Sequence, residues 1–443
     1  MIIKRIMSCV LLLLFTNLVY VIRIIPSVWV AIPAEIVLGA FYVRFNIIPL
    51  KDTAPQRRLR ILNGGCELML TAIFCFTFEC LAYLYIFLGE VSVERHILIV
   101  NALVCGFLLF ILLVNGILRI FLCSTQLGIL PRILLVFFWW VPVANIIFIQ
   151  KYLRISRLEY KYTIDRYRLN EDRKQEEICK TKYPILMVHG VFFRDWKNFN
   201  YWGRIPKALL DNGATIYYGN HQSATSVENS AEELKQCILD IVRENGCEKV
   251  NIIAHSKGGL DSRFAISCLG VGEHVASLTT INTPHLGCNY VRRLLQIIPY
   301  KVVEAIGKKY KSIYTKLGDE NPDFFSGLKD LTDKECSRLN GIMKDNPNVC
   351  YQSVGSRMRS PSGAMFPMNV GYCLIKLLGG GDNDGLTSTK SMMWGNFLGT
   401  LHPQGRQGIS HGDMIDLTRK NIESFDVCEF YVDLINKLRQ MGF

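Results

Sequence analysis

Charge is almost absent from one long part of this chain. Between Ile97 and Gln150 the only charged side chains are Arg119 and Arg132, whereas beyond Lys151 charged and turn residues are as frequent as in globular domains. Half of the 443 residues are hydrophobic. Because a transmembrane helix needs about 20 mostly apolar residues, this pattern argues against an entirely water-exposed protein and predicts membrane-buried helices. The chain divides near Gln150.

The sequence predicts neither a cysteine-based site nor a nucleic-acid-binding site. The 15 cysteines are odd in number and contain no CxxC spacing, so neither a zinc site nor a full disulfide framework is predicted and reduced thiols are expected. The net charge of +12 is not gathered into a basic patch with interleaved aromatics, which argues against nucleic acid as a partner. Basic residues that flank membrane segments account for this charge and make the bilayer the expected partner.

Four apolar stretches reach or approach the length of a membrane span, namely residues 6–25, 66–88, 97–122 and 129–149. A fifth stretch, residues 28–45, is shorter and contains Pro33 and Glu35, which is compatible with a span, a re-entrant segment or an interfacial helix. The sequence therefore predicts an all-α transmembrane region over residues 1–150.

Five polar residues interrupt these apolar stretches: Glu35, Glu67, Glu79, Asn101 and Asn115. Such residues mark a transport path or form hydrogen bonds between neighbouring helices. Because they are scattered singly, we expect hydrogen bonds between helices.

The distribution of Lys and Arg predicts the topology. Basic residues collect in the loop over residues 44–60 and in a charged segment over residues 151–182, which is predicted to be a juxtamembrane linker helix. Cytoplasmic loops carry an excess of such residues, and reduced thiols also favour a reducing compartment. We therefore expect an integral membrane protein, with its second half on the cytoplasmic face.

From Tyr183 onwards, strand and helix patterns alternate, which predicts a mostly parallel sheet covered by helices on both faces. The predicted strands are residues 185–188, 214–218, 249–254 and 275–281. Residues 230–233 have the pattern of a capping box at a helix start, and residues 258–269 are predicted to form a helix. Residues 183–443 thus form the predicted α/β domain.

The turn between the third predicted strand and its helix has the pattern of a nucleophile elbow. Ala254-His255-Ser256-Lys257-Gly258 places small residues two positions before and after Ser256, with alanine replacing the usual first glycine. The sharp turn requires small neighbours there and presents the serine hydroxyl above the sheet. Ser256 is the predicted nucleophile, and a helix N-cap serine is the alternative interpretation.

A serine nucleophile needs a base that is oriented by an acid, and in this fold the chain order is Ser, Asp or Glu, then His. His411 lies on a polar loop near the C-terminus and is the predicted base, with His402 as the alternative. Asp384 is the predicted acid, with Asp382 as the alternative. A calcium-like loop is a further interpretation of this acidic cluster.

An acyl transfer also requires hydrogen-bond donors for the developing oxyanion. The amide of Lys257, directly after the nucleophile, is one predicted donor. The second is predicted to be Val191, in the loop that follows His189-Gly190.

Eight blocks in the second half occur in the order found in one family. They are residues 183–190, 201–206, 211–214, 249–259, 283–287, 328–332, 383–386 and 411–413. Through these blocks the chain resembles the bacterial triacylglycerol lipases of the Pseudomonas type, over about six-tenths of its length. The resemblance implies the α/β-hydrolase fold, a carboxylic ester hydrolase, a triad of Ser256, Asp384 and His411, and oxyanion donors at Val191 and Lys257.

The chain also departs from that family. Asp413 matches one calcium-binding aspartate, but the second is missing before Gly379, so no cofactor is expected to be required and a calcium ion at Asp413 is an open alternative. Lys390 stands where the family has a bridging cysteine. The family lacks the N-terminal membrane region, which together with the resemblance to bacterial lipases implies an integral protein of a bacterial plasma membrane.

The insertion over residues 290–331 mixes apolar and basic residues and is similar to the mobile lid of these lipases, or it forms an ordinary cap helix. The leading hypothesis is a membrane-anchored serine esterase that cleaves lipid esters such as acylglycerols. A thioesterase, a phospholipase, an amidase or an inactive hydrolase-like scaffold are the alternatives. The oligomeric state is open.

Overall fold

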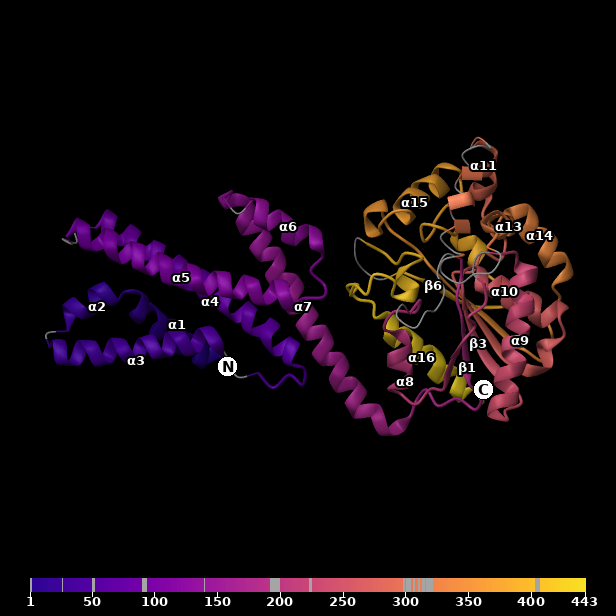
Figure 1. The fold of residues 1–443 in the computed structure, drawn as a ribbon, viewed down its shortest axis with the longest axis horizontal. Helices are drawn as coiled ribbons and strands as arrows, with labels where there is room; N and C mark the ends of the chain where they lie inside the picture. Colours follow the sequence, from indigo (N-terminus) through magenta and orange to yellow (C-terminus); the bar gives the residue numbers. More distant parts are fainter. Residues whose placement is uncertain are drawn as a thin grey trace. The chain divides into compact units, whose positions relative to one another are not determined.

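A computed structural model describes the chain except for residues 1, 26, 50–51, 90–93, 139, 192–199, 223–224, 298, 300–303, 306, 310, 313–314, 316–321 and 403–406. The chain forms two compact units, Met1–Arg168 and Leu169–Phe443 (Figure 1).

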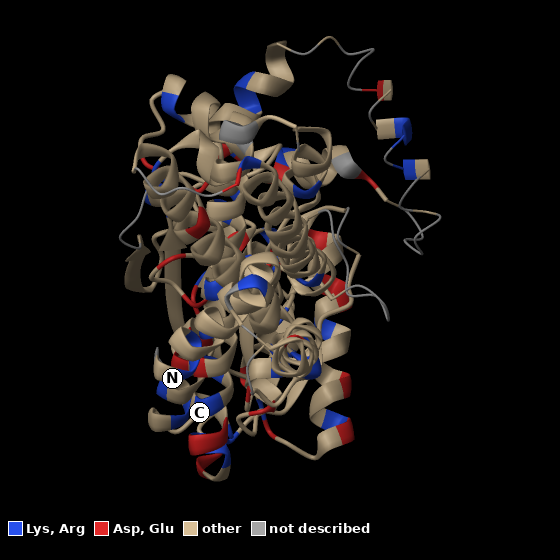
Figure 2. Ribbon diagram, turned by 90° about the vertical axis from the view of Figure 1, so that its left-hand side faces the viewer, with Lys and Arg blue, Asp and Glu red and all other residues tan. Residues whose placement is uncertain are grey.

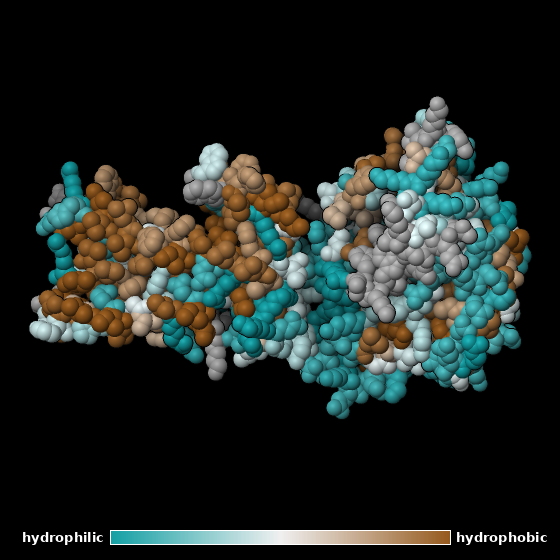
Figure 3. Space-filling view, in the orientation of Figure 1, coloured by the Kyte–Doolittle hydropathy of each residue, from teal (hydrophilic) through white to brown (hydrophobic). Residues whose placement is uncertain are grey.

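The first unit is helical. Its helices are α1 (Ile2–Thr16), α2 (Leu18–Ile24), α3 (Val28–Ile47), α4 (Arg57–Leu88), α5 (Arg95–Cys123), α6 (Ile129–Phe138) and the start of α7 (Pro142–Arg173). Of these, α3, α4 and α5 are long and apolar enough to cross a membrane. Apolar side chains predominate on the face of this unit that Figure 3 shows. The shorter stretch with Pro33 therefore forms one continuous helix of membrane-spanning length.

Two predicted spans are divided in the structure. The run over residues 6–25 breaks at Asn17, whose backbone leaves the helical region (φ −95°, ψ 29°) and whose side-chain amide donates to the Leu13 carbonyl. An asparagine side chain competes with the helical backbone for hydrogen bonds in this way. The run over residues 129–149 ends at Phe138 and resumes at Pro142. Proline is favoured at the first position of a helix because it lacks an N–H group.

The polar residues of the apolar stretches mostly join helices. Glu67 accepts from Arg5, and Glu79 accepts from Asn17. Asn101 donates to Asn17, and Asn115 donates to the Asn46 carbonyl. Hydrogen bonding between helices is thus confirmed for these four residues. It is not seen for Glu35, whose carboxylate oxygens are buried without a hydrogen-bond partner among the described residues.

The predicted linker helix differs in its bounds. Instead of occupying residues 151–182, it is part of α7, which begins in the apolar stretch at Pro142 and ends at Arg173. The chain then makes a short turn in which Glu177 has a positive φ of 42°. The boundary between the two compact units falls between residues 168 and 169 of the chain, whereas the sequence predicted boundaries near residues 150 and 182.

The second unit is built on a parallel sheet with the strand order β2-β1-β3-β4-β5-β6. Every neighbouring pair is parallel. The strands are β1 (Ile185–Val188), β2 (Ile216–Tyr218), β3 (Val250–His255), β4 (Val275–Ile281), β5 (Cys350–Ser356) and β6 (Asn396–Leu401).

The two faces of this sheet bury separate hydrophobic clusters, because successive strand side chains point to opposite faces. Ile185 and Met187 of β1 pack in one cluster with α8 (Ile205–Leu210) and α16 (Val427–Gln440). Leu186 and Val188 pack in the other with α9 (Val227–Asn245), α10 (Lys257–Cys268) and α14 (Asp333–Ile342). Figure 1 shows these helices on the two sides of the sheet. This arrangement, with a sharp turn between β3 and α10, is the predicted α/β-hydrolase fold.

Helix α9 begins earlier than its capping-box pattern predicts. Its N-cap is Ser226, whose hydroxyl accepts from the Asn229 amide at 3.2 Å. Ser230 lies inside the helix, is fully buried and accepts a hydrogen bond from Lys257. The capping prediction was wrong because a buried serine that bonds a distant side chain has the same local pattern as a cap.

Three further helices lie between β4 and the chain's last loops: α11 (Asn289–Ile297), α13 (Phe324–Asp330) and α15 (Met368–Leu377). Part of the predicted lid over residues 290–331 lies outside the described residues, namely residues 298, 300–303, 306, 310, 313–314 and 316–321, and its described part includes α13 and most of α11. Figure 2 shows that uncharged residues predominate along the ribbon and that residues of both charge signs are interspersed among them.

Candidate active site

Ser256 occupies a strained turn directly between β3 and α10. Its backbone has φ 55° and ψ −129°, which a non-glycine residue adopts only when its surroundings impose it. A Cβ atom at Gly190 would lie 2.8 Å from the Ser256 Cβ, and one at Gly258 would lie 2.4 Å from the His189 carbonyl oxygen. Glycine is therefore required where the end of β1 meets the turn. This close packing fixes the direction of the serine side chain.

Asp384 and His411 are joined by a hydrogen bond of 2.6 Å between the carboxylate Oδ2 and the imidazole Nδ1. Both residues are buried. The second carboxylate oxygen of Asp384 accepts from the amides of Leu386 and Thr387 at 2.9 and 2.7 Å. The backbone N–H of His411 donates to the Asp384 carbonyl. The carboxylate is thus held in one orientation, and the imidazole has Nε2 left to accept a proton.

The two alternative residues lie in other surroundings. Asp382 is exposed and forms an ion pair with Arg357, and His402 is exposed with its Nδ1 2.8 Å from the Thr400 carbonyl. Among the described residues, neither Asp382 nor His402 forms a side-chain hydrogen bond with Asp384 or His411. The geometry therefore favours Asp384 and His411 as the acid and base.

His255, the last residue of β3 and the one before Ser256, packs against His411. Its ring centroid lies 4.5 Å from that of His411, so His411 is at the carboxyl end of β3. Burial, together with the nearby charge of His411, lowers the pKa of His255 well below its ordinary value. His255 therefore stays neutral beside an imidazole that becomes positively charged when it accepts a proton.

The two predicted oxyanion donors flank the same turn. Lys257 is the first residue of α10, where the backbone N–H groups have no partner within the helix. Val191 is buried and follows His189-Gly190 at the end of β1. The assignment of both donors stays a prediction.

A buried charge network that the sequence analysis missed lies behind this turn. The Lys257 ammonium donates to Asp261 at 2.7 Å and to the Ser230 hydroxyl at 2.8 Å. The other Asp261 oxygen lies 3.4 Å from His221 Nε2, and the His221 ring stacks on His189 at 4.1 Å. Burial raises the pKa of Asp261 to about 6, although the neighbouring ammonium lowers it. The spacing of Lys257 and Asp261, four residues apart in a helix, was the available signal.

The residues at the calcium position do not fit a calcium ion. The Asp413 carboxylate accepts from the Ser410 amide at 2.8 Å and from the Ser410 hydroxyl at 2.7 Å. Nearby Asp416 forms an ion pair with Arg204 at 2.7 Å. No group of three or more His, Cys, Asp or Glu residues suited to a metal occurs among the described residues. Since Ca²⁺ takes six to eight oxygen ligands, these bonded carboxylates offer too few.

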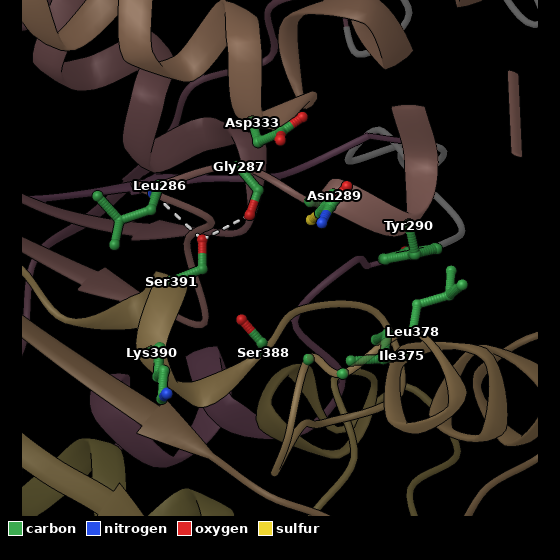
Figure 4. A pocket seen from close by; sticks show the side chains of 13 residues that line it. Leu286, Gly287, Asn289, Tyr290, Asp333, Ile375, Leu378, Ser388, Lys390 and Ser391 are labelled. Atoms are coloured by element: carbon green, nitrogen blue, oxygen red, sulfur yellow. Dashed lines mark hydrogen bonds between the residues drawn. The ribbon is translucent and has the colours of Figure 1, made fainter. Parts of the chain in front are cut away.

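The cysteines are all free thiols in the described chain. Lys390, at the position of the family's bridging cysteine, lines a cavity of about 210 Å³ instead. Figure 4 shows Tyr290, Ile375 and Leu378 grouped on one side of this cavity. On the other side, Ser391 bonds Leu286 and Gly287. Ser256, Asp384 and His411 do not line it.

The second unit is similar to known lipases and esterases. Residues 206–357 match a family model described as "Putative serine esterase (DUF676)". The chain is 28% identical over 291 residues to the triacylglycerol lipase of Vibrio cholerae, covering 60% of this chain and 91% of the relative. It is 30% identical over 172 residues to that of Pseudarthrobacter phenanthrenivorans, covering 36% of this chain and 53% of the relative. The solved structure of Staphylococcus hyicus lipase superposes with a TM-score of 0.46 at 17% identity, covering 59% of this chain and 98% of that one.

The chain thus spans most of one curated relative and about half of another. The family model includes Ser256 but ends before Asp384 and His411. The serine esterase family model and the triacylglycerol lipase relatives identify a carboxylic ester hydrolase, which confirms the predicted class of enzyme.

Proposed function

We propose that the chain is a membrane-anchored lipase that cleaves lipid esters through a triad of Ser256, His411 and Asp384. The observation that carries the proposal is the short Asp384–His411 hydrogen bond at the end of the strand that presents Ser256. This arrangement matches the roles of a nucleophile, a base and an acid that orients the base. The similarity to triacylglycerol lipases supports a lipid ester as the substrate.

In the acylation step, Ser256 Oγ forms a bond to the carbonyl carbon of the ester while His411 Nε2 takes the hydroxyl proton. The negative charge that develops on the carbonyl oxygen is stabilised by the backbone N–H groups of Lys257 and Val191. Asp384 stabilises the resulting imidazolium through Nδ1. The carbon–oxygen bond to the alcohol then breaks, and the alcohol leaves with the proton from His411. The product is an acyl-enzyme on Ser256.

Deacylation repeats these steps with water as the nucleophile. His411 takes a proton from water as the oxygen attacks the acyl carbon, and the Ser256 oxygen leaves with that proton. The carboxylic acid is released.

Helices α3, α4 and α5 support anchoring in a bilayer, in which long-chain esters are concentrated. The same three catalytic side chains could attack a thioester, a phospholipid or an amide, and an inactive scaffold is a further alternative. The ester is favoured because the matched family model and relatives are esterases and lipases.

A panel of lipid substrates tests this proposal. We expect full-length protein in detergent micelles to release fatty acid from a long-chain acylglycerol faster than from a phospholipid, an acyl thioester or an acyl amide of the same chain. An amide has a poorer leaving group than an ester, and the similarity to triacylglycerol lipases favours the acylglycerol over the phospholipid and the thioester. Fatty acid release at matched substrate concentrations is the measurement. Faster cleavage of the thioester or the phospholipid would contradict the proposed acylglycerol substrate and identify the faster compound as the better substrate class.

The cytoplasmic location of the second unit is tested by thiol labelling. Cys268 is an exposed thiol of this unit, and exposed thiols react while buried ones are inert. We expect a membrane-impermeant maleimide to leave Cys268 unmodified in intact cells and to modify it after lysis, measured by mass spectrometry. Cys268→Ser identifies the peptide. Modification in intact cells would place the unit on the outer face.

A further inference from the structure

Helix α15 presents apolar side chains on both of its faces. On the inner face Met368, Tyr372 and Ile375 are buried. On the outer face Val370 is 47% exposed and Leu377 is 81% exposed, and Phe366, just before the helix, is 78% exposed. The separation of seven residues between Val370 and Leu377 places these two along one side of the helix, and Phe366 adds an exposed ring just before it. A helix that is apolar all round is normally covered by something other than water.

The inner face of α15 rests on the loops that carry the proposed acid and base. The Gly412 amide, next to His411, donates to the Met368 sulfur at 3.3 Å. A Cβ atom at Gly371 would lie 2.0 Å from the Gly385 carbonyl oxygen, so the helix backbone directly touches the residue after Asp384. The exposed apolar side of α15 therefore lies directly above the proposed catalytic loops. In Figure 1, α15 lies along the margin of the second unit.

The charge of this segment fits a lipid surface. Residues 361–378 contain no acidic side chain and only one basic side chain, Lys376. The Lys376 ammonium lies 5.1 Å from the Tyr372 ring and is partly exposed. Interfacial helices bury an apolar face at the headgroup boundary and keep basic residues beside it. Three candidate spans in the same chain bring the protein to a bilayer.

We propose that the stripe formed by Phe366, Val370, Cys373 and Leu377 docks into the surface of the bilayer. It thereby places the loops of Asp384 and His411 at the level where lipid esters leave the membrane. This inference rests on the proposed function for its purpose, but the contact itself needs no catalysis. Cys373 belongs to the stripe because its exposed thiol follows Val370 by three residues and precedes Leu377 by four.

Native thiols provide the first test. A nitrobenzoxadiazole label is placed on Cys373 in full-length Ser256→Ala protein that also carries Cys80→Ser and Cys268→Ser. The protein is reconstituted in phosphatidylcholine–phosphatidylglycerol vesicles that contain lipid with a doxyl quencher on the acyl chain. We expect the label on Cys373 to lose most of its fluorescence when the quencher is present.

The matched control carries the label on Cys268, with Cys80→Ser and Cys373→Ser. Cys268 ends α10, which runs back from Ser256, so it lies at the opposite end of the helix from the proposed site. We expect its fluorescence to be unchanged by the quencher. Equal fluorescence with and without quencher at Cys373 would overturn the proposal. Because Ser256→Ala protein is used, this result does not depend on the proposed activity.

Kinetics provide the second test. We expect Leu377→Asp to lower the hydrolysis of a long-chain ester in vesicles by about 10-fold, because it removes one exposed apolar side chain that docking buries in the bilayer. Hydrolysis of a short-chain, water-soluble ester should be unchanged. Leu210→Asp is the control, because Leu210 is 55% exposed at the end of α8. A loss of both activities in Leu377→Asp, or cross-linking of Cys373 to a second copy without quenching, would contradict docking to lipid.

Discussion

We expect Ser256→Ala to abolish labelling by a fluorophosphonate probe and to lower ester hydrolysis by about 10⁴-fold to 10⁶-fold. The probe forms a covalent bond only with a serine whose hydroxyl is activated by a base. Ser256 is held in an uncommon backbone conformation at the end of β3, where His411 also lies. Alanine removes the attacking oxygen and leaves the turn otherwise intact. In-gel fluorescence of the labelled protein and fatty acid release are the measurements.

Ser262→Ala is the matched control for this substitution. Ser262 lies on the same helix, is buried and donates its hydroxyl to the Gly258 carbonyl at 2.7 Å. Labelling should persist in Ser262→Ala. Wild-type protein that remains unlabelled in detergent, or a Ser256→Ala variant that is still labelled, would contradict the assignment of the nucleophile.

Asp384→Asn is expected to lower kcat by about 10³-fold to 10⁴-fold while the fold is retained. The Asp384 carboxylate accepts from His411 Nδ1 and thereby keeps the proton off Nε2. An amide at this position can donate to Nδ1, which favours the wrong tautomer of the imidazole. The KM is expected to change little, because Asp384 is buried and does not contact the substrate. Steady-state kinetics on a soluble ester measure both constants.

Asp382→Asn separates this effect from a general effect on the loop. Asp382 is two residues away and exposed, and its carboxylate pairs with Arg357 and Lys376 instead of an imidazole. Exposed ion pairs contribute little, so activity should fall less than about 3-fold. A larger loss in Asp382→Asn than in Asp384→Asn would exchange the roles of the two aspartates.

The parts of the second unit that follow from local patterns were predicted well. The strand over residues 275–281 matches β4, and the predicted third strand differs from β3 by one residue at each end. The turn at Ser256 was predicted from five consecutive residues, because its steric limits depend on neighbours in sequence. Chain order alone left Asp382 and Asp384 open, the resemblance to the lipases implied Asp384, and the hydrogen bond to His411 supports that choice.

Features that depend on distant residues were not predicted. The break at Asn17 involves bonds to Glu79 and Asn101 on two other helices, which hydropathy cannot reveal. The charge network needs His221 and Asp261, which lie 40 residues apart and meet only because β2 and β3 both flank β1. The start of α9 was misplaced for the same reason, because Ser230 bonds Lys257 from the next helix.

The pairing of Lys257 with Asp261 restricts how this chain can change over time. Each side chain is almost fully enclosed, so replacing either one alone leaves an uncompensated charge in the interior, at a cost of about 3–5 kcal/mol. Two uncharged residues of similar volume could replace the pair together at little cost. Positions 257 and 261 are therefore expected to change together, so that a lineage that loses the Lys257 charge tends to lose the Asp261 charge as well.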